Sequence, residues 1–142
     1  MRTRDFQDLV VWQRAMTLTR EVYELARRLP VEERFALASQ MRRAAVSVPA
    51  NIAEGHASAY GRTFVRHLSI AHASLMELEC HLSIAIDVGY LDPGDAATAR
   101  AASDEVSRML RAMRRTLRDG LARRSTLDAP PQHTARRNRS QS

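Results

Sequence analysis

The segment from Gln40 to Gly55 constrains the fold of this chain more than any other part. Its apolar residues recur at the spacing of an amphipathic helix, yet Pro49 and Asn51 lie in its interior. An interior proline removes a backbone hydrogen bond and costs a helix about 3 kcal/mol. A helix that keeps such a proline must be held by other parts of the chain, so we predict that this segment packs in a tertiary core.

The composition predicts that this core is aliphatic and helical. Hydrophobic residues make up 44% of the 142 residues, whereas aromatic residues make up only 5%. The core must then be built from Ala, Leu, Val, Ile and Met, and such a mixture favours packed helices over a sheet. A chain of this length is expected to form one domain.

Proline and glycine divide the chain into four expected helices, at about residues 8–29, 31–53, 62–88 and 92–120. Gly55 is expected to end the second helix in a left-handed conformation, and Asp92 and Pro93 are expected to begin the fourth. Short connections imply antiparallel neighbours. The predicted fold is therefore an all-α, antiparallel up-down four-helix bundle over residues 1–124, followed by a disordered basic tail over residues 125–142.

The third expected helix carries two apolar stripes. One follows a strict 4-3 spacing that is typical of a bundle seam. The other lies on a different face and is more apolar than the solvent-facing side of a monomeric bundle needs, so we predict self-association. The seam consists of Phe64, Leu68, Ala71, Leu75, Leu78, Leu82 and Ala85, and the second stripe of Ile70, Ala73, Ile84 and Val88.

The charge of the chain favours a polyanionic partner. All 22 basic residues are arginine, against 16 acidic residues, which gives a net charge of +6. Arginine binds phosphate through a bidentate fork, although a GC-rich genome also favours arginine over lysine. Arginines recur at helical spacing in the fourth helix, where they either contact phosphates or form an ordinary solvated face. The predicted nucleic-acid-binding residues are Arg108, Arg111, Arg114, Arg115 and Arg118, with Arg42 and Arg43 as a second group that could instead pair between subunits.

A set of polar residues is expected on the facing sides of the second and third helices. Buried polar groups must find partners. We expect these side chains to bond one another and the carbonyl that Pro49 frees, and so to fix the register of the helices; a ligand-binding role is the alternative. The predicted polar network consists of Ser47, Asn51, Glu54, Ser74 and Glu77.

Nothing in the sequence favours catalysis or a cofactor. No Glu has a His three residues later, as di-iron bundles require, and Glu77 with His81 makes an incomplete metal site. Cys80 projects about 100° away from His81 around a helix, so the two do not form a nucleophilic pair. Gly-rich phosphate loops and nucleophile elbows are absent. We expect no enzymatic activity, no metal and no cofactor.

The chain has no apolar run of 18 or more residues and no basic-then-apolar leader. Neither a membrane span nor a signal peptide is therefore expected. The single Cys80 cannot form an internal disulfide. We expect a cytoplasmic protein.

Several motifs stand in the order of a known family, from about Phe6 to Leu91. They are Leu9-Val10-Val11-Trp12, Val22-Tyr23, the Gln40–Gly55 segment, Phe64 with Leu68, Ile70-Ala71, Ser74 with Glu77-Leu78, and Gly89-Tyr90-Leu91. On these residues the chain resembles the 23S rRNA intervening-sequence proteins. The resemblance implies a four-helix bundle that forms a ring-like homopentamer and has a role in nucleic-acid binding. The family has distant relatives among the accessory proteins of diversity-generating retroelements, which support a reverse transcriptase.

The chain departs from that family in the linker before the third helix. The family usually carries a basic, Ser-capped linker. In this chain the linker runs from His56 to Thr63, and Arg62 is its only arginine. This difference moves the predicted binding surface to the fourth helix and the tail. We therefore expect a non-enzymatic oligomeric bundle that binds RNA or DNA backbone; the alternative is a protein-interaction scaffold, such as an accessory factor of a retroelement reverse transcriptase.

Overall fold

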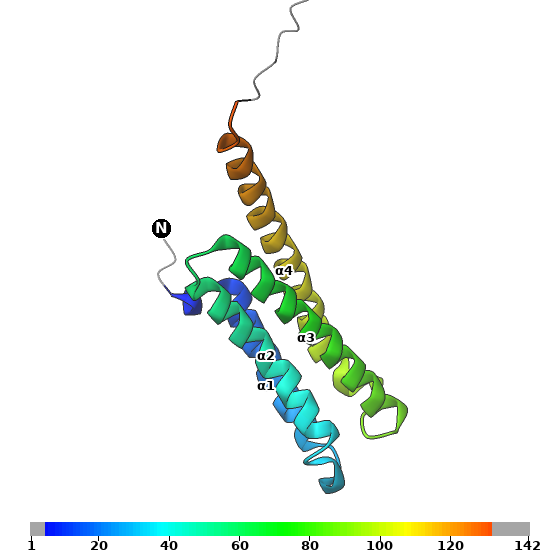
Figure 1. Cartoon of the computed structure of the whole chain (residues 1–142). Coiled ribbons are helices and arrows are strands. Elements are labelled where there is room, and N and C mark those ends of the chain that lie inside the picture. The colour runs from blue at the N-terminus through cyan, green and yellow to red at the C-terminus, as the bar shows by residue number, and fades with distance from the viewer. Residues whose placement is uncertain (1–4, 132–142) are drawn as a thin grey trace, which may run out of the picture.

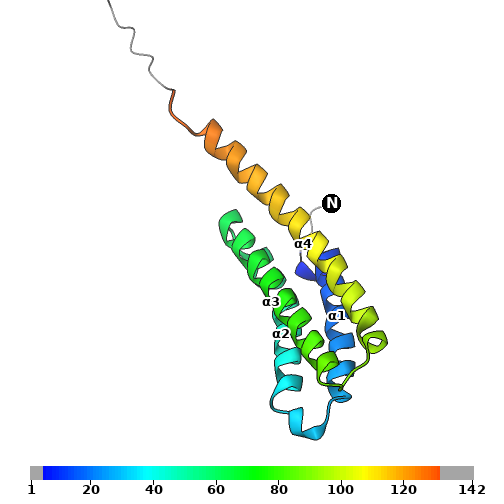
Figure 2. The same cartoon turned by 90° about the vertical axis from the view of Figure 1, so that its right-hand side faces the viewer.

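The computed structural model describes residues 5–131, and this part of the chain contains four α-helices and no strand. The helices are α1 (Val10–Arg27), α2 (Leu37–Ala57), α3 (Gly61–Asp87) and α4 (Pro93–Leu127), with short 3-10 turns η1 (Phe6–Asp8) and η2 (Val31–Glu33). Each helix packs against two others: α1 and α3 both contact α2 and α4 (Figures 1 and 2). The predicted all-α class is confirmed.

The connections lie at opposite ends of the molecule. The α1–α2 and α3–α4 connections are at one end, and the α2–α3 connection is at the other (Figure 1). The C-terminal part of α4 projects past the other three helices (Figure 2). No helix in residues 5–131 is long and apolar enough to cross a membrane.

The core is aliphatic, as the composition predicts. Its largest fully buried side chains come from all four helices, and each contributes about 1.5–3 kcal/mol through burial. The predicted seam of α3 is confirmed, since six of its seven residues are buried and Phe64 packs at its edge. The fully buried side chains include Leu18, Val22, Met41, Val48, Ile52, Leu68, Leu75, Leu78, Leu82, Val106 and Leu110.

The start of α2 was predicted wrongly. After Pro30 the chain forms η2, and α2 begins only at Leu37. The Glu33 carboxylate accepts a hydrogen bond from the Leu37 backbone N–H at 3.0 Å and another from the Tyr90 hydroxyl at 3.1 Å. The N–H of the first helical residue has no acceptor within its own helix, and Glu33 supplies one. Glu33 also ties this end of α2 to Tyr90, which follows α3.

The role predicted for Gly55 is also wrong. Gly55 is buried within α2, which continues to Ala57, and its backbone is not left-handed. A Cβ atom at Gly55 would lie 2.9 Å from the Cβ of His67. Glycine therefore stands here because α3 approaches closely, and not because the helix ends.

The junction between α3 and α4 follows helix-capping rules. Gly89 has a φ of 87°, and hydrogen bonds from Gly89 N to Ile86 O and from Tyr90 N to Ala85 O close a Schellman motif. The predicted start of α4 is confirmed: Pro93 is its first residue and Asp92 its N-cap, whose N–H donates to the Asp95 carboxylate at 2.8 Å.

The end of α4 differs from the prediction. The helix runs through Gly120 to Leu127, because a single glycine weakens a helix by only about 1 kcal/mol. The boundary predicted between residues 124 and 125 therefore falls inside α4. Of the predicted disordered tail, residues 132–142 lie outside the described part of the chain.

Candidate nucleic-acid interface

Four arginines form one exposed face of α4, which we call the α4 arginine face: Arg108, Arg111, Arg115 and Arg118. Within residues 5–131, none of them forms an ion pair, whereas Arg14 and Arg28 pair with Glu105 and Asp95 at 3.3 and 3.0 Å. The guanidinium groups of this face are therefore available to an external anion.

Beside this face, polar side chains meet between α3 and α4. The hydroxyl oxygen of Ser107, a residue only 3% exposed, lies 3.1 Å from His72 Nε2 and accepts a hydrogen bond from Arg111 Nη2 at 3.2 Å. Arg114 is partly buried; its Nη1 donates to Ser69 Oγ at 3.4 Å, and its buried Nε has no partner in the described structure. We call these five residues the α3–α4 polar cluster.

The electrostatics of the α3–α4 polar cluster are strongly positive. Burial lowers the pKa of His72 below its usual 6.5, and the charges of Arg114 and Arg111 lower it further. Burial and the neighbouring Arg118 and Arg111 also lower the pKa of Arg114, although an arginine remains charged at neutral pH. Cations held close together without a carboxylate favour a bound anion.

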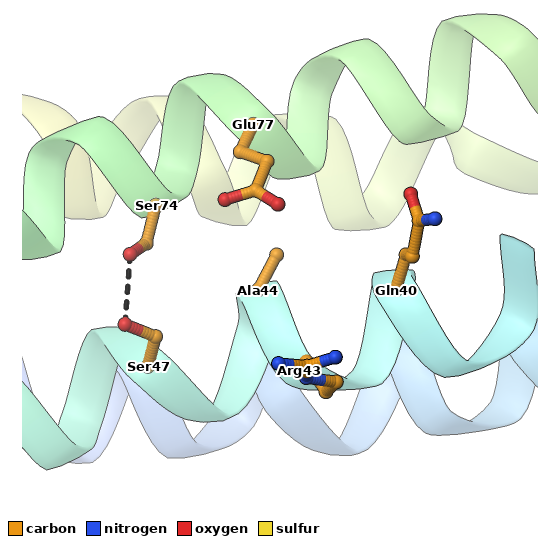
Figure 3. Close-up of a pocket in the computed structure, with 6 residues that line it drawn as sticks. All are labelled: Gln40, Arg43, Ala44, Ser47, Ser74 and Glu77. Carbon is orange, nitrogen blue, oxygen red and sulfur yellow. Dashed lines mark hydrogen bonds between the residues drawn. The ribbon is translucent and has the colours of Figure 1, made fainter.

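The other two predicted binding arginines lie elsewhere. Arg42 and Arg43 are on α2, which does not pack against α4. Arg42 donates to the backbone carbonyl of Arg34 at 3.1 Å and so braces the α1–α2 connection. Arg43 lines a cleft between α2 and α3 (Figure 3). The structure does not bring these two arginines into the α4 arginine face.

Three residues of the predicted polar network meet where α2 and α3 face each other. Ser74 Oγ donates to Ser47 Oγ at 2.8 Å, as Figure 3 shows. Asn51 Nδ2 lies 2.8 Å from the Ser47 carbonyl and 3.0 Å from Ser47 Oγ. A fourth member, which the sequence analysis did not name, is His67 of α3, whose Nδ1 lies 3.0 Å from Asn51 Oδ1. Together these bonds couple α2 to α3.

The two predicted carboxylates stand at the edge of this network. Glu54 approaches His67 Nδ1 at 3.6 Å with its side chain largely exposed. Glu77 extends into the cleft of about 340 Å³ that Ser47 and Ser74 also line (Figure 3), and its carboxylate lies 3.7 Å from His81 Nε2. No group of three His, Cys, Asp or Glu side chains within residues 5–131 is placed to hold a metal ion.

The carbonyl that Pro49 frees has a different partner from the one predicted. That carbonyl belongs to Ala45, four residues earlier, and it lies 3.3 Å from Thr19 Oγ1 of α1. The same hydroxyl lies 2.8 Å from the Ala15 carbonyl. Pro49 is therefore accommodated by a contact between α1 and α2, and not by the network of Ser47 and Asn51.

Comparison with known proteins assigns the chain to a family. A model of the 23S rRNA-intervening sequence proteins matches residues 7–112. The chain belongs to this family. A crystal structure of a protein of unknown function from the S23 ribosomal protein family of Bacteroides thetaiotaomicron has a similar fold, with a TM-score of 0.68 and 24% sequence identity over 73% of this chain and 97% of that chain. No curated protein matches the sequence.

The family match covers one candidate site completely and the other in part. The network of Ser47, Asn51 and Ser74 lies within it, whereas Arg114, Arg115 and Arg118 lie beyond its last residue, 112. Two of the four residues of the α4 arginine face, Arg115 and Arg118, therefore lie outside the part of the chain that matches the family, and Arg108 and Arg111 lie within it.

The polar residues that the sequence analysis missed share one feature. Thr19, His67, His72 and Ser107 each directly neighbour a buried aliphatic residue of a helix seam: Leu18, Leu68, Ala71 and Val106. A polar side chain beside a seam position reaches the boundary between two helices. The sequence shows this adjacency, but it does not show which helix each side chain meets.

Proposed function

We propose that this member of the family is a non-enzymatic, oligomeric bundle that binds the backbone of RNA or DNA through the α4 arginine face. The observation that supports it is a row of exposed arginines on one helix, none paired with a carboxylate within residues 5–131. Contacts with phosphate add affinity without reading the base sequence. A nucleic-acid partner fits a cytoplasmic protein.

The dimensions of the face suit a phosphate backbone. Ten residues of helix separate Arg108 from Arg118, which corresponds to about 15 Å along the axis. One strand of a duplex carries a phosphate about every 3.4 Å along its axis, so the face spans about four phosphates. Arg114 adds a fifth guanidinium beside them.

Self-association would multiply these contacts. We propose an antiparallel up-down bundle that assembles through the second apolar stripe of α3, because Ile70, Ile84 and Val88 are 39%, 42% and 53% exposed. The homopentamer implied by the family resemblance would present several arginine faces to one nucleic acid. Linked sites bind more tightly than any one of them.

The test is the salt dependence of binding by the full-length protein, once light scattering has fixed the mass of the oligomer. Labelled single-stranded RNA and duplex DNA are titrated at 50 and 200 mM salt, and fluorescence anisotropy is recorded. Four phosphate contacts predict that affinity falls about 50-fold for the single strand and about 150-fold for the duplex. A well-formed oligomer that binds neither at low salt would refute the proposal.

Exposed apolar residues at the α1–α2 connection support a second candidate, a scaffold for a protein partner such as a retroelement reverse transcriptase. Phe35 is 88% exposed and Val31 76% exposed, and aromatic residues are frequent anchors of interfaces. A neighbouring reverse-transcriptase gene would favour this candidate. Substitution Phe35→Ser should then abolish co-purification of that enzyme, and retained co-purification would count against this surface.

A further inference from the structure

We propose that the α3–α4 polar cluster binds one phosphate group through His72, Arg111 and Arg114, and that His72 takes up a proton when the anion binds. The inference rests on the proposed function, because it identifies the phosphate as part of a nucleic-acid backbone. It adds a discrete site and a dependence on pH, neither of which a row of exposed arginines would have.

The geometry brings hydrogen-bond donors to one place. Ser107 fixes His72 and Arg111 side by side, since its buried hydroxyl oxygen lies 3.1 Å from His72 Nε2 and 3.2 Å from Arg111 Nη2. Arg114 keeps unused donors: its Nε has no acceptor in the described structure, and its bond to Ser69 is 3.4 Å long. An oxyanion has enough acceptor oxygens for these N–H groups.

The charges that act on His72 come from two arginines. From α4, Arg114 and Arg111 disfavour the imidazolium. From α2, the other helix packed against α3, Glu54 approaches His67, while Arg43 lines the cleft with Glu77. No ion pair in residues 5–131 joins a carboxylate to His72, Arg111 or Arg114. A bound anion would supply the missing negative charge.

The proton balance follows from the hydrogen bonds. Because burial and the two arginines lower the pKa of His72, we assign a neutral ring without an anion, with Nε2 accepting the Ser107 O–H while the Ser107 oxygen accepts from Arg111. A bound phosphate offsets the two arginines and raises the pKa of His72, which takes a proton from solvent, so that Nε2 becomes a donor. Affinity should then increase as the pH falls between about 8 and 5.

The first test follows the His72 ring by NMR in the full-length protein, with sulfate as the probe because its charge is constant over this pH range. The resonance is assigned with His72→Gln. The pKa of His72 should be higher in sulfate than in chloride at matched ionic strength. Arg114→Gln should abolish the difference, and Arg123→Gln, an exposed arginine of the same helix, should keep it. Equal pKa values of His72 in both salts would overturn the inference.

Folding of each variant is checked by circular dichroism, and Arg111→Gln replaces Arg114→Gln if the latter unfolds.

The second test measures RNA affinity as a function of pH. If binding raises the pKa of His72 by one unit, the affinity for the anion should increase approximately tenfold from the high-pH to the low-pH end of the titration. The wild type should therefore bind oligouridylate up to about tenfold more tightly near pH 5 than near pH 8. The bases of oligouridylate do not titrate in this pH range.

Three outcomes separate this inference from the proposed function. If the increase in RNA affinity at low pH is lost in His72→Gln and kept in His67→Gln, the inference is supported. If the protein binds RNA with the same affinity at low and high pH, the inference is overturned and the proposed function stands. If sulfate shifts the pKa of His72 but the protein binds no RNA, the proposed nucleic-acid function is overturned. The identification of the bound phosphate as part of a nucleic-acid backbone is then overturned as well, and the cluster is a site for a free oxyanion.

Discussion

Replacing Thr19 by Val tests how the bundle accommodates Pro49. Pro49 has no N–H for the buried Ala45 carbonyl, and Thr19 Oγ1 lies 3.3 Å from that oxygen. Valine keeps the shape of threonine but leaves the carbonyl without a partner. A buried unsatisfied acceptor costs about 1–3 kcal/mol. Because the hydroxyl is shared with the closer Ala15 carbonyl at 2.8 Å, we expect a loss near the lower end, about 1–1.5 kcal/mol.

The same substitution should matter less when residue 49 is alanine. Pro49→Ala should leave the protein folded and supply an N–H for the Ala45 carbonyl, so Thr19→Val should then cost less than about 0.5 kcal/mol. The expected coupling between the two sites is about 1 kcal/mol. Urea unfolding of the four variants at one protein concentration measures it. Additivity within about 0.3 kcal/mol would refute this reasoning, and unfolding of Pro49→Ala would show that the proline itself is required.

Three further predictions follow from the packing and the charges. Gly55→Ala should destabilise the protein by about 1–2 kcal/mol in urea unfolding, because its Cβ would meet His67, whereas Gly120→Ala has open space and should stabilise α4 by about 0.5–1 kcal/mol; the reverse order would contradict the packing. Ile70→Glu with Ile84→Glu should lower the mass in light scattering without loss of helical circular dichroism, and an unchanged mass would exclude this face from the assembly. Since the lowered pKa of His72 means that the unfolded chain binds more protons, stability should fall as the pH drops below about 6.5 and fall less in His72→Gln; an equal fall in both would contradict this assignment.

Local periodicity was enough to predict α3 and its seam. The 4-3 repeat from Phe64 to Ala85 contains no proline or glycine, so the apolar stripe alone fixes which face is buried. The start of α4 was equally predictable, because Asp92 and Pro93 act within one turn of the chain. The exposed arginines of α4 were found for the same reason, since their spacing is a property of a single helix.

Features that depend on distant residues were not predictable in this way. The start of α2 depends on Glu33 meeting Tyr90, which is 57 residues away along the chain. The sequence around Gly55 does not distinguish a glycine that ends a helix from one that lets a neighbouring helix approach. The α3–α4 polar cluster needs the relative rotation of two helices to bring His72 to Ser107, and no single periodic pattern contains it.

The proposed function is tested most sharply by two variants that lose the same charge from different surfaces. One carries Arg108→Gln, Arg111→Gln, Arg115→Gln and Arg118→Gln on the α4 arginine face. The control carries Arg20→Gln, Arg27→Gln, Arg28→Gln and Arg34→Gln on exposed positions of α1 and the α1–α2 connection.

Binding of single-stranded RNA is measured for both variants and for the wild type across a range of salt concentrations. Loss of four phosphate contacts should flatten the slope of log affinity against log salt by about 2.8 in the first variant, and the control should keep the wild-type slope. Equal slopes in all three proteins, or equal flattening in both variants, would show that the α4 arginine face is not the nucleic-acid surface.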